Sequence, residues 1–236
     1  MLRTIWVAIY FVVYLVLLFP QQWKVNRLEK QGKIQELQAL LHSIALHWGR
    51  RIIKNTGTKV SIYGSDHIPE GPVLFVSNHQ GNLDIPLLLG FIDKPKSFIA
   101  KIELSKIPVF GKWMERINCI FIDRSDPRQS LRAINQGVEI LKNGHSMVIF
   151  PEGTRSKGPK MADFKKGSLR LATKAKVPIV PISIQGSYKI MEANGGFIKP
   201  AEVSITISEP IYTDQLTKEE ENGLSDSVYE IIKNHL

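Results

Sequence analysis

A histidine and an aspartate follow a short apolar segment of the chain. Residues 73–76 are all apolar, which is typical of a buried strand, and His79 and Asp84 come just after them, five positions apart. Pro86 then lies in the first turn of an apolar helix. We therefore expect His79 and Asp84 beyond the carboxyl end of a strand, at the edge where open α/β sheets bind ligands.

These two residue types are suited to removing a proton from a hydroxyl group. A neutral imidazole accepts a proton near neutral pH. A carboxylate bound to its other ring nitrogen holds the tautomer and stabilises the imidazolium that forms. A base of this kind contributes about 10²–10⁴-fold to a rate. The spacing also fits a structural histidine and an aspartate that caps the helix, so the pair alone leaves both interpretations open.

Positively charged side chains follow other predicted strands. Lys101, Arg124 and Arg155 each lie within a few residues of a strand end, and parallel strands would bring those ends to the same edge as His79. A guanidinium group binds phosphate through two parallel hydrogen bonds, so we expect the arginines to hold a phosphate and Lys101 to assist. Gly153 would let the backbone approach that ligand and offer its N–H. A single cation is commonly a solvated surface residue, but three beside a His–Asp pair favour a catalytic site for an anionic substrate.

Short apolar runs alternate with helical patterns through most of the chain. This alternation predicts an α/β fold with a largely parallel β-sheet flanked by helices on both faces. Pro178 and Pro181 suggest that the strand at 179–184 lies at an edge or begins irregularly. Leu131 is expected in the buried stripe of a helix that follows Pro127. The strands are expected at 60–63, 73–76, 97–100, 119–122, 147–150, 179–184 and 203–207.

The chain begins with an apolar segment that predicts a membrane anchor. Residues 5–19 carry no charge, and as a helix they would reach about 22 Å, less than the roughly 30 Å hydrocarbon layer of a bilayer. Basic residues flank the segment on both sides, although positive charge prefers the cytoplasmic side of a membrane. These features favour a monotopic anchor on the cytoplasmic face of the cell membrane over a spanning helix. No small-residue cleavage site follows, which argues against a signal peptide.

A second helical pattern, at residues 34–53, has one apolar face. It is equally compatible with the returning limb of a two-helix membrane-anchoring motif and with a helix packed on the globular core. Asn55 and Gly57 mark a boundary after it. We therefore divide the chain into an N-terminal helical membrane-anchoring region, residues 1–56, and an α/β catalytic domain, residues 57–236.

The composition narrows the function classes. The 236 residues carry 31 Lys and Arg against 22 Asp and Glu, a net charge of +9, which implies an anionic partner. A single cysteine, Cys119, excludes an internal disulfide framework and fits a reducing compartment. The sequence contains no zinc-ligand spacing, Gly-x-Ser-x-Gly elbow or P-loop motif. Nucleic acid would also match the positive charge, but the apolar N-terminal segment argues against such a partner.

Four short blocks match, in order and spacing, the motifs of one enzyme family. They are Asn-His-Gln-Gly-Asn-Leu-Asp at 78–84, Phe-Ile-Asp-Arg at 121–124, Phe-Pro-Glu-Gly-Thr-Arg-Ser at 150–156 and Val-Pro-Ile-Val-Pro-Ile at 177–182. From about Tyr63 to Gly186 the chain resembles the 1-acyl-glycerol-3-phosphate acyltransferases, the bacterial lysophosphatidic acid acyltransferase branch of the glycerolipid acyltransferases. Gly81 departs from the Ser of many members, and Asn118-Cys119 from the usual Gly. We expect these departures to affect local backbone or acyl-chain fit rather than proton transfer.

The resemblance implies transfer of an acyl group from an acyl thioester, acyl-ACP or acyl-CoA, to the sn-2 hydroxyl of 1-acyl-glycerol 3-phosphate. The product would be phosphatidic acid for phospholipid synthesis. His79 would be the general base and Asp84 its orienting partner, and the lysophosphatidic acid acceptor would be met at an anionic membrane surface. No metal and no other cofactor is implied. The residues that would bind and orient the substrate are Lys101, Arg124, Glu152, Gly153, Thr154 and Arg155.

Two alternatives stay open at this point. The first keeps the chemistry but changes the acceptor to glycerol 3-phosphate or another lysophospholipid, because the four blocks do not distinguish these acceptors. The second is a non-catalytic protein of the membrane surface that binds anionic lipid through its basic patches.

Overall fold

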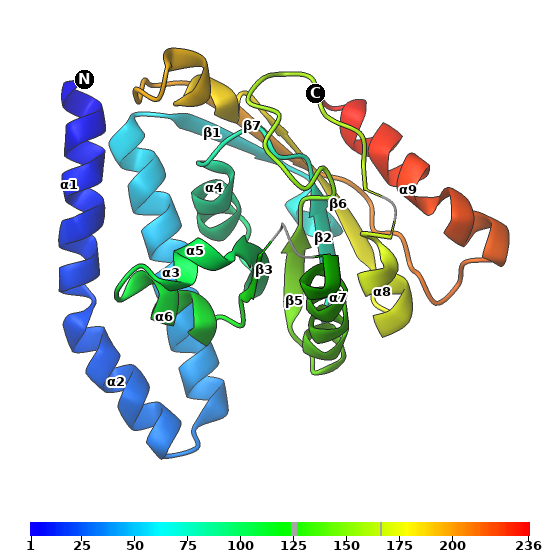
Figure 1. The fold of residues 1–236 in the computed structure, drawn as a ribbon, viewed down its shortest axis with the longest axis horizontal. Coiled ribbons are helices and arrows are strands. Elements are labelled where there is room, and N and C mark those ends of the chain that lie inside the picture. The colour runs from blue at the N-terminus through cyan, green and yellow to red at the C-terminus, as the bar shows by residue number, and fades with distance from the viewer. Residues whose placement is uncertain (124–126, 166) are drawn as a thin grey trace.

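A seven-stranded sheet forms the centre of the molecule (Figure 1). In this computed structural model, which describes residues 1–123, 127–165 and 167–236, the strand order is β1-β7-β6-β2-β5-β3-β4. Every neighbouring pair is parallel except β6 and β7, which confirms the predicted fold class. The boundaries agree with the sequence-based ones to within one residue. The strands are β1 (Lys59–Tyr63), β2 (Leu74–Ser77), β3 (Lys96–Lys101), β4 (Ile120–Ile122), β5 (Ser146–Ile149), β6 (Ile179–Gln185) and β7 (Glu202–Ile207).

Strand β6 lies inside the sheet, so of the two alternatives that its prolines suggested, an edge position or an irregular start, the edge position was wrong. It pairs with β2 on one side and with β7 on the other. The carbonyl of Pro181 accepts a hydrogen bond of 2.9 Å from the N–H of Ser208. The nitrogen of Pro181 points to the same side of the strand, where β7 has already ended at Ile207. A proline has no N–H to donate, and at this position the ladder does not require one.

Helices cover both faces of the sheet (Figure 1). One apolar core, which contains the fully buried Ile53, lies between the sheet and α1, α3 and α4, and a second, which contains Leu141, lies against α7, α8 and α9. Leu131 was expected in the buried stripe of α7 but is 60% exposed, because the helix turns Ala133 toward the sheet instead. The helices are α1 (Leu2–Leu17), α2 (Phe19–Lys30), α3 (Ile34–Thr56), α4 (Asp84–Phe91), α5 (Ile102–Ser105), α6 (Phe110–Arg116), α7 (Pro127–Lys142), α8 (Arg170–Ala175) and α9 (Lys218–Lys233), with single 3₁₀ turns η1 (Ser65–His67), η2 (Ser187–Lys189) and η3 (Glu192–Asn194).

The N-terminal apolar segment forms parts of two helices. α1 ends at Leu17 and α2 begins at Phe19, and the two helices meet at a bend of 42°. Among the described residues, no helix alone has the length and hydropathy needed to cross a bilayer, although α1 and α2 taken together do. α3 packs against α4 and buries Ile52 and Ile53, which confirms the interpretation of residues 34–53 as a helix packed on the core. The domain boundary after residue 56, where α3 ends, stays a prediction.

Helices α3 and α4 approach each other at two glycines. A Cβ added at Gly49 would lie 2.5 Å from the nitrogen of Gly90 and from the carbonyl oxygen of Pro86. A Cβ added at Gly90 would lie 2.5 Å from the nitrogen of Arg50. Side chains do not fit at such distances, so both positions need glycine. Because α4 begins at Asp84, this contact holds in place the helix that carries one half of the His–Asp pair.

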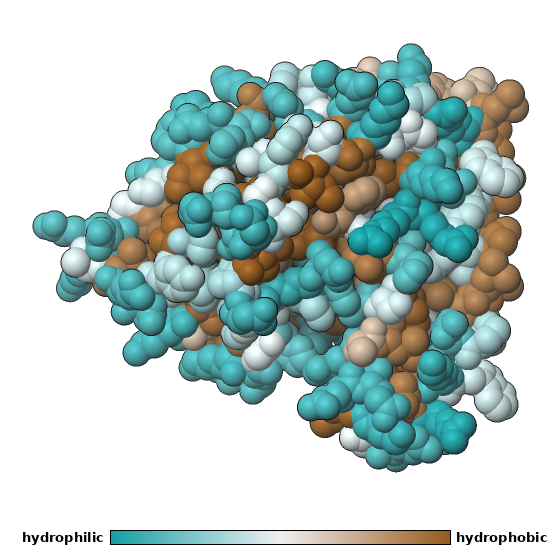
Figure 2. Space-filling view, turned by 180° about the vertical axis from the view of Figure 1, so that it is seen from behind, coloured by the Kyte–Doolittle hydropathy of each residue, from teal (hydrophilic) through white to brown (hydrophobic). Residues whose placement is uncertain are grey.

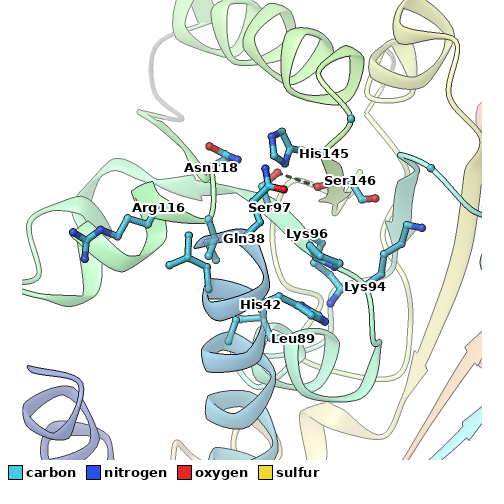
Figure 3. Close-up of a pocket in the computed structure, with 16 residues that line it drawn as sticks. Gln38, His42, Leu89, Lys94, Lys96, Ser97, Arg116, Asn118, His145 and Ser146 are labelled. Carbon is cyan, nitrogen blue, oxygen red and sulfur yellow. Dashed lines mark hydrogen bonds between the residues drawn. The ribbon is translucent and has the colours of Figure 1, made fainter. Parts of the chain in front are cut away.

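A cavity of about 240 Å³ with several charged and polar side chains in its wall lies at the amino ends of β3 and β5, the opposite end of these strands from the turn that follows β5 (Figure 3). Lys96 lines it and is 7% exposed, and its Nζ donates a hydrogen bond of 2.8 Å to the carbonyl of Ile92. Burial lowers the pKa of Lys96 from 10.5 to about 7, while the carboxylate of Asp93 acts in the opposite direction. The folded protein therefore disfavours the charged form of this side chain.

Substitution of this lysine is expected to change how stability depends on pH. The folded-state pKa lies below the unfolded one, so the stability of the native protein falls as the pH drops from about 10.5 to about 7 and this contribution is constant below that range. Lys96→Met should raise the free energy of unfolding above that of the native protein, and this increase should be about 3 kcal/mol larger at pH 7 than at pH 10. The carbonyl of Ile92 keeps a donor, the N–H of Lys94. Denaturant unfolding at the two pH values measures this difference, with exposed Lys142→Met as the control; equal gains at both pH values would contradict it.

Candidate active site

The histidine and aspartate predicted to act together are in contact. His79 Nδ1 lies 2.7 Å from Asp84 Oδ2. The Asp84 side chain is fully buried, and 12% of the His79 side chain is exposed. The carboxylate can only accept here, so the hydrogen of the neutral ring lies on Nδ1 and Nε2 is left as the basic nitrogen. The pair therefore presents a proton acceptor at Nε2.

The loop between β2 and α4 is held by contacts on several sides. Asn78 exchanges two hydrogen bonds of 2.8 Å with the backbone of Ile184 in β6. The N–H of Gly81 donates to the same oxygen of Asp84 that binds the histidine, at 2.8 Å. The ring of Phe150, which follows β5, stacks on the ring of His79 with centroids 4.0 Å apart and planes 17° apart. These contacts fix both the carboxylate and the plane of the imidazole.

Glu152 supports the same loop through its carboxylate. Its Oε1 accepts a hydrogen bond of 2.6 Å from the N–H of His79, and its Oε2 accepts one of 2.8 Å from the N–H of Ala162. Burial raises the pKa of Glu152, and the two backbone donors act in the opposite direction. The residue is 3% exposed, so the structure gives it a role in positioning His79. Its predicted contact with the acceptor stays a prediction.

Gly153 forms the turn that follows β5. Its φ is +70°, in the left-handed region that favours glycine, and a Cβ would lie 2.6 Å from Cε of Lys165. The N–H of Gly153 donates to the carbonyl of Phe150 at 3.0 Å. It therefore stabilises the turn, whereas we had expected it to face a ligand. The N–H of Ser156 donates to the carbonyl of His79 at 2.8 Å. The turn is thereby tied to the His79 loop.

Arg155 belongs to a polar network beside the histidine. Its Nη1 donates to Asn82 Oδ1 at 2.6 Å and lies 3.5 Å from Glu192 Oε1. The N–H of Asn82 donates to that same Glu192 oxygen at 2.8 Å. Among the described residues, Nε and Nη2 of Arg155 have no partner. They form the edge of the guanidinium group that can bind two oxygens of a phosphate.

A cavity of about 430 Å³ lies beside His79. Its volume is in the range of typical ligand sites. His79, Asn82, Lys101, Thr154 and Arg155 supply polar groups to its wall. Most of its remaining wall is apolar and comes from α1, α3, β3 and α6. Among the apolar residues are Phe11, Leu15, Trp48, Phe98, Phe110 and Trp113.

The structure therefore brings three of the six predicted binding residues, Lys101, Thr154 and Arg155, into one cavity with His79. Glu152 and Gly153 support its wall, and Arg124 lies outside the described residues. Within those residues, His, Cys, Asp and Glu side chains form no group of three that could hold a metal ion. The arrangement can take a proton from the hydroxyl of a molecule that carries an anionic group and an apolar chain.

Asn82, Phe150 and Glu192 are among the residues of the site for which the sequence predicted no role. Asn82 and Phe150 stand inside the recognised blocks, so their nearness in sequence to His79 and Glu152 was a usable signal. Glu192 is 110 positions from the Asn82 that it contacts, and the sequence around it contains no pattern that points to the site.

Comparison with known proteins relates the chain to enzymes of lipid synthesis. Residues 59–185 match the family model described as Acyltransferase. A chloroplastic 1-acyl-sn-glycerol-3-phosphate acyltransferase of Brassica napus is 37% identical over 176 residues, 72% of this chain and 51% of that protein. A probable 1-acyl-sn-glycerol-3-phosphate acyltransferase of Mycoplasma genitalium is 35% identical over 75% of this chain and 70% of its own length. The chain thus spans about half the length of several curated relatives that it matches.

Similarity to a solved structure extends over the whole chain. The crystal structure of the 1-acyl-sn-glycerophosphate acyltransferase PlsC from Thermotoga maritima superposes with a TM-score of 0.86 and 32% sequence identity. The superposition covers 99% of this chain and 93% of that one, so the similarity includes the N-terminal helices as well as the sheet.

Proposed function

The chain belongs to the acyltransferase family, and we propose that it transfers an acyl group from an acyl thioester to the sn-2 hydroxyl of 1-acyl-sn-glycerol 3-phosphate, giving phosphatidic acid. The observation that carries the proposal is the contact of 2.7 Å between His79 Nδ1 and Asp84 Oδ2 in the wall of a cavity shared with Arg155. The names of the relatives support this acceptor, and the donor is acyl-ACP or acyl-CoA.

The reaction needs one proton acceptor and no covalent acyl-enzyme. The hydroxyl oxygen of the acceptor forms a bond to the thioester carbonyl carbon while Nε2 of His79 takes the hydroxyl proton. Asp84 accepts the Nδ1 hydrogen throughout and stabilises the imidazolium. The tetrahedral intermediate then breaks its C–S bond, and the leaving thiolate takes the proton from His79. The histidine returns to its starting state, and the products are an ester and a thiol.

The rest of the cavity suits the remaining parts of the substrates. Arg155 presents Nε and Nη2 to the acceptor phosphate, and Lys101 adds a positive charge in the same wall. The apolar residues contributed by α1, α3 and α6 suit a fatty-acyl chain, because burying methylene groups is favourable by about 0.8 kcal/mol each. Arg124 is retained as a further candidate for the phosphate.

Formation of phosphatidic acid from lysophosphatidic acid tests the proposed reaction. Purified protein with lysophosphatidic acid and each donor in turn should form phosphatidic acid, followed by mass spectrometry. Glycerol 3-phosphate and other lysophospholipids serve as competing acceptors in the same assay. Acylation of one of those in preference to lysophosphatidic acid would contradict the proposed acceptor.

Binding of the acceptor phosphate by Arg155 can be tested separately. In Arg155→Ala the KM for the phosphorylated acceptor should rise about 10- to 100-fold, because a charge-assisted hydrogen bond contributes about 1.5–3 kcal/mol. The KM for the thioester donor should change little. Steady-state kinetics with each substrate varied in turn measures the split, and exposed Arg132→Ala is the control. An equal rise in both KM values would count against a phosphate role.

Attachment to the cytoplasmic face of the cell membrane through α1 and α2 is part of the proposal. Its support is a strip of exposed apolar side chains along the edge of the molecule formed by α1 (Figure 2). Trp6, Val16, Phe19 and Trp23 are 56%, 62%, 62% and 79% exposed. Large exposed apolar patches mark protein or membrane contacts, and Trp favours the headgroup level of a bilayer. Other residues of α1 line the cavity, so a lipid in the bilayer would lie close to the site.

Vesicle flotation tests the attachment. The double variant Val12→Glu/Val16→Glu places two charges on the exposed face of α1 and should reduce the fraction of protein that floats with vesicles containing anionic lipid several-fold. The matched control is Leu131→Glu, which charges an exposed apolar residue on α7. Equal flotation of the double variant and the native protein would remove α1 from the contact.

A further inference from the structure

Glu192 is the buried carboxylate of the polar network beside His79, and the proposed reaction assigns it no task. It lies in η3, outside the residues that match the family model. Only 5% of its side chain is exposed. Its Oε1 accepts a hydrogen bond of 2.8 Å from the N–H of Asn82 and lies 3.5 Å from Nη1 of Arg155. One oxygen therefore contacts both residues that meet in the 2.6 Å hydrogen bond between Arg155 and Asn82.

The second oxygen of Glu192 lies against Gly81. A Cβ added at Gly81 would be 2.5 Å from Oε2 of Glu192, a distance that side chains do not adopt. The φ of Gly81 is not among the positive values of the chain, so the backbone conformation does not require a glycine, but a larger residue here would have to displace the end of the Glu192 side chain. Oε2 accepts no hydrogen bond from the described residues, which makes its burial unfavourable. The glycine in this place thus leaves room for a buried carboxylate of which, among the described residues, only Oε1 has a partner.

We infer that Glu192 is a positioning residue that aims Arg155 at the phosphate of the acceptor. The inference rests on the proposed function. An arginine side chain has many rotamers, and holding one nitrogen removes most of them before the substrate arrives. Glu192 Oε1 and Asn82 Oδ1 both hold Nη1 of Arg155, so the Nε and Nη2 edge is left to face a ligand. Glu192 also fixes the backbone of Asn82, three positions after His79, so the phosphate site and the base keep one geometry.

The expected effect of Glu192→Ala is a rise of about tenfold in the KM for lysophosphatidic acid, because Arg155 and the N–H of Asn82 each lose a partner. The KM for the donor should stay within about twofold. Glu192→Gln keeps an oxygen that can accept from the N–H of Asn82, so its acceptor KM should stay within about threefold of the native value. Rescue by this conservative variant separates positioning from general destabilisation.

Gly81→Ser tests the same contact from the other side. In the native background the added Cβ must displace the Glu192 carboxylate, so the acceptor KM should rise by a similar factor. In the Glu192→Ala background the space is free, and adding Gly81→Ser should change the acceptor KM by less than about twofold. The two substitutions should therefore be strongly non-additive.

The native protein and Glu209→Ala serve as references, because Glu209 is an exposed carboxylate that follows the end of β7, near the amino end of β6, whereas the His79 loop follows the carboxyl end of β2. Thermal unfolding shows whether each variant is folded. If Glu192→Ala does not fold, Glu192→Gln and Gly81→Ser still test the positioning role. Acceptor KM values at the native level in all three variants, additive effects, or equal rises in both KM values would overturn the inference. Failure of the native protein to acylate lysophosphatidic acid would instead overturn the proposed function, and the inference with it.

Discussion

His79→Ala is expected to lower kcat for acyl transfer by about 10²–10⁴-fold, the contribution of a positioned general base. The substitution removes the nitrogen that takes the hydroxyl proton and leaves the cavity, Arg155 and the N-terminal helices in place. The KM values for both substrates should therefore change little, and the variant should float with vesicles as the native protein does. Single-turnover measurement of phosphatidic acid formation isolates the chemical step.

The chain contains a matched control for this substitution. His42 Nε2 lies 2.8 Å from Asp93 Oδ1, a second His–Asp pair with nearly the same separation as the first. His42 lines the cavity at the amino ends of β3 and β5 (Figure 3) and not the cavity beside His79. His42→Ala should therefore leave kcat at the native level. Turnover in His79→Ala comparable to that of His42→Ala would remove His79 from the mechanism.

Asp84→Asn is expected to give a loss of the same order, about 10²–10⁴-fold in kcat. Asp84 Oδ2 accepts hydrogen bonds from Nδ1 of His79 and from the N–H of Gly81. An amide oxygen can satisfy only part of this arrangement, and an amide nitrogen facing the ring would favour the tautomer in which Nε2 carries the hydrogen. The ring would then have no free nitrogen for the acceptor hydroxyl, and no carboxylate would stabilise an imidazolium.

Asp84→Asn replaces a carboxylate by an amide group of about the same size, so a loss of kcat reports on the chemistry of the group and not on packing. Asn has nearly the same shape as Asp, so the packing of α4 at Gly49 and Gly90 should persist and the unfolding temperature should show a folded protein. Asp93→Asn is the corresponding substitution in the second His–Asp pair and should leave kcat unchanged. A kcat for Asp84→Asn within about threefold of the native value would contradict the orienting role.

Arg155 and Glu152 show what a local sequence pattern predicts about a site and what it does not. Both lie in a block recognised from local spacing, and both were expected to bind substrate. The structure places Arg155 in the wall of the cavity, whereas the two oxygens of Glu152 are bound to the N–H groups of His79 and Ala162. Local spacing therefore located the turn after β5, but the direction of each side chain depends on which distant backbone groups pack against it.

The sequence by itself determined the strands, the predominantly parallel sheet and the pairing of His79 with Asp84. These features depend on residues close together in the chain, because alternating apolar runs specify the elements and a separation of only five positions keeps the two side chains within reach. Only the tertiary structure decided that β6 lies inside the sheet, that Leu131 is exposed, and that Glu192 reaches Asn82 across 110 positions. Contacts of that kind form when separate elements pack together, and each depends on the shape of every neighbour rather than on any local pattern.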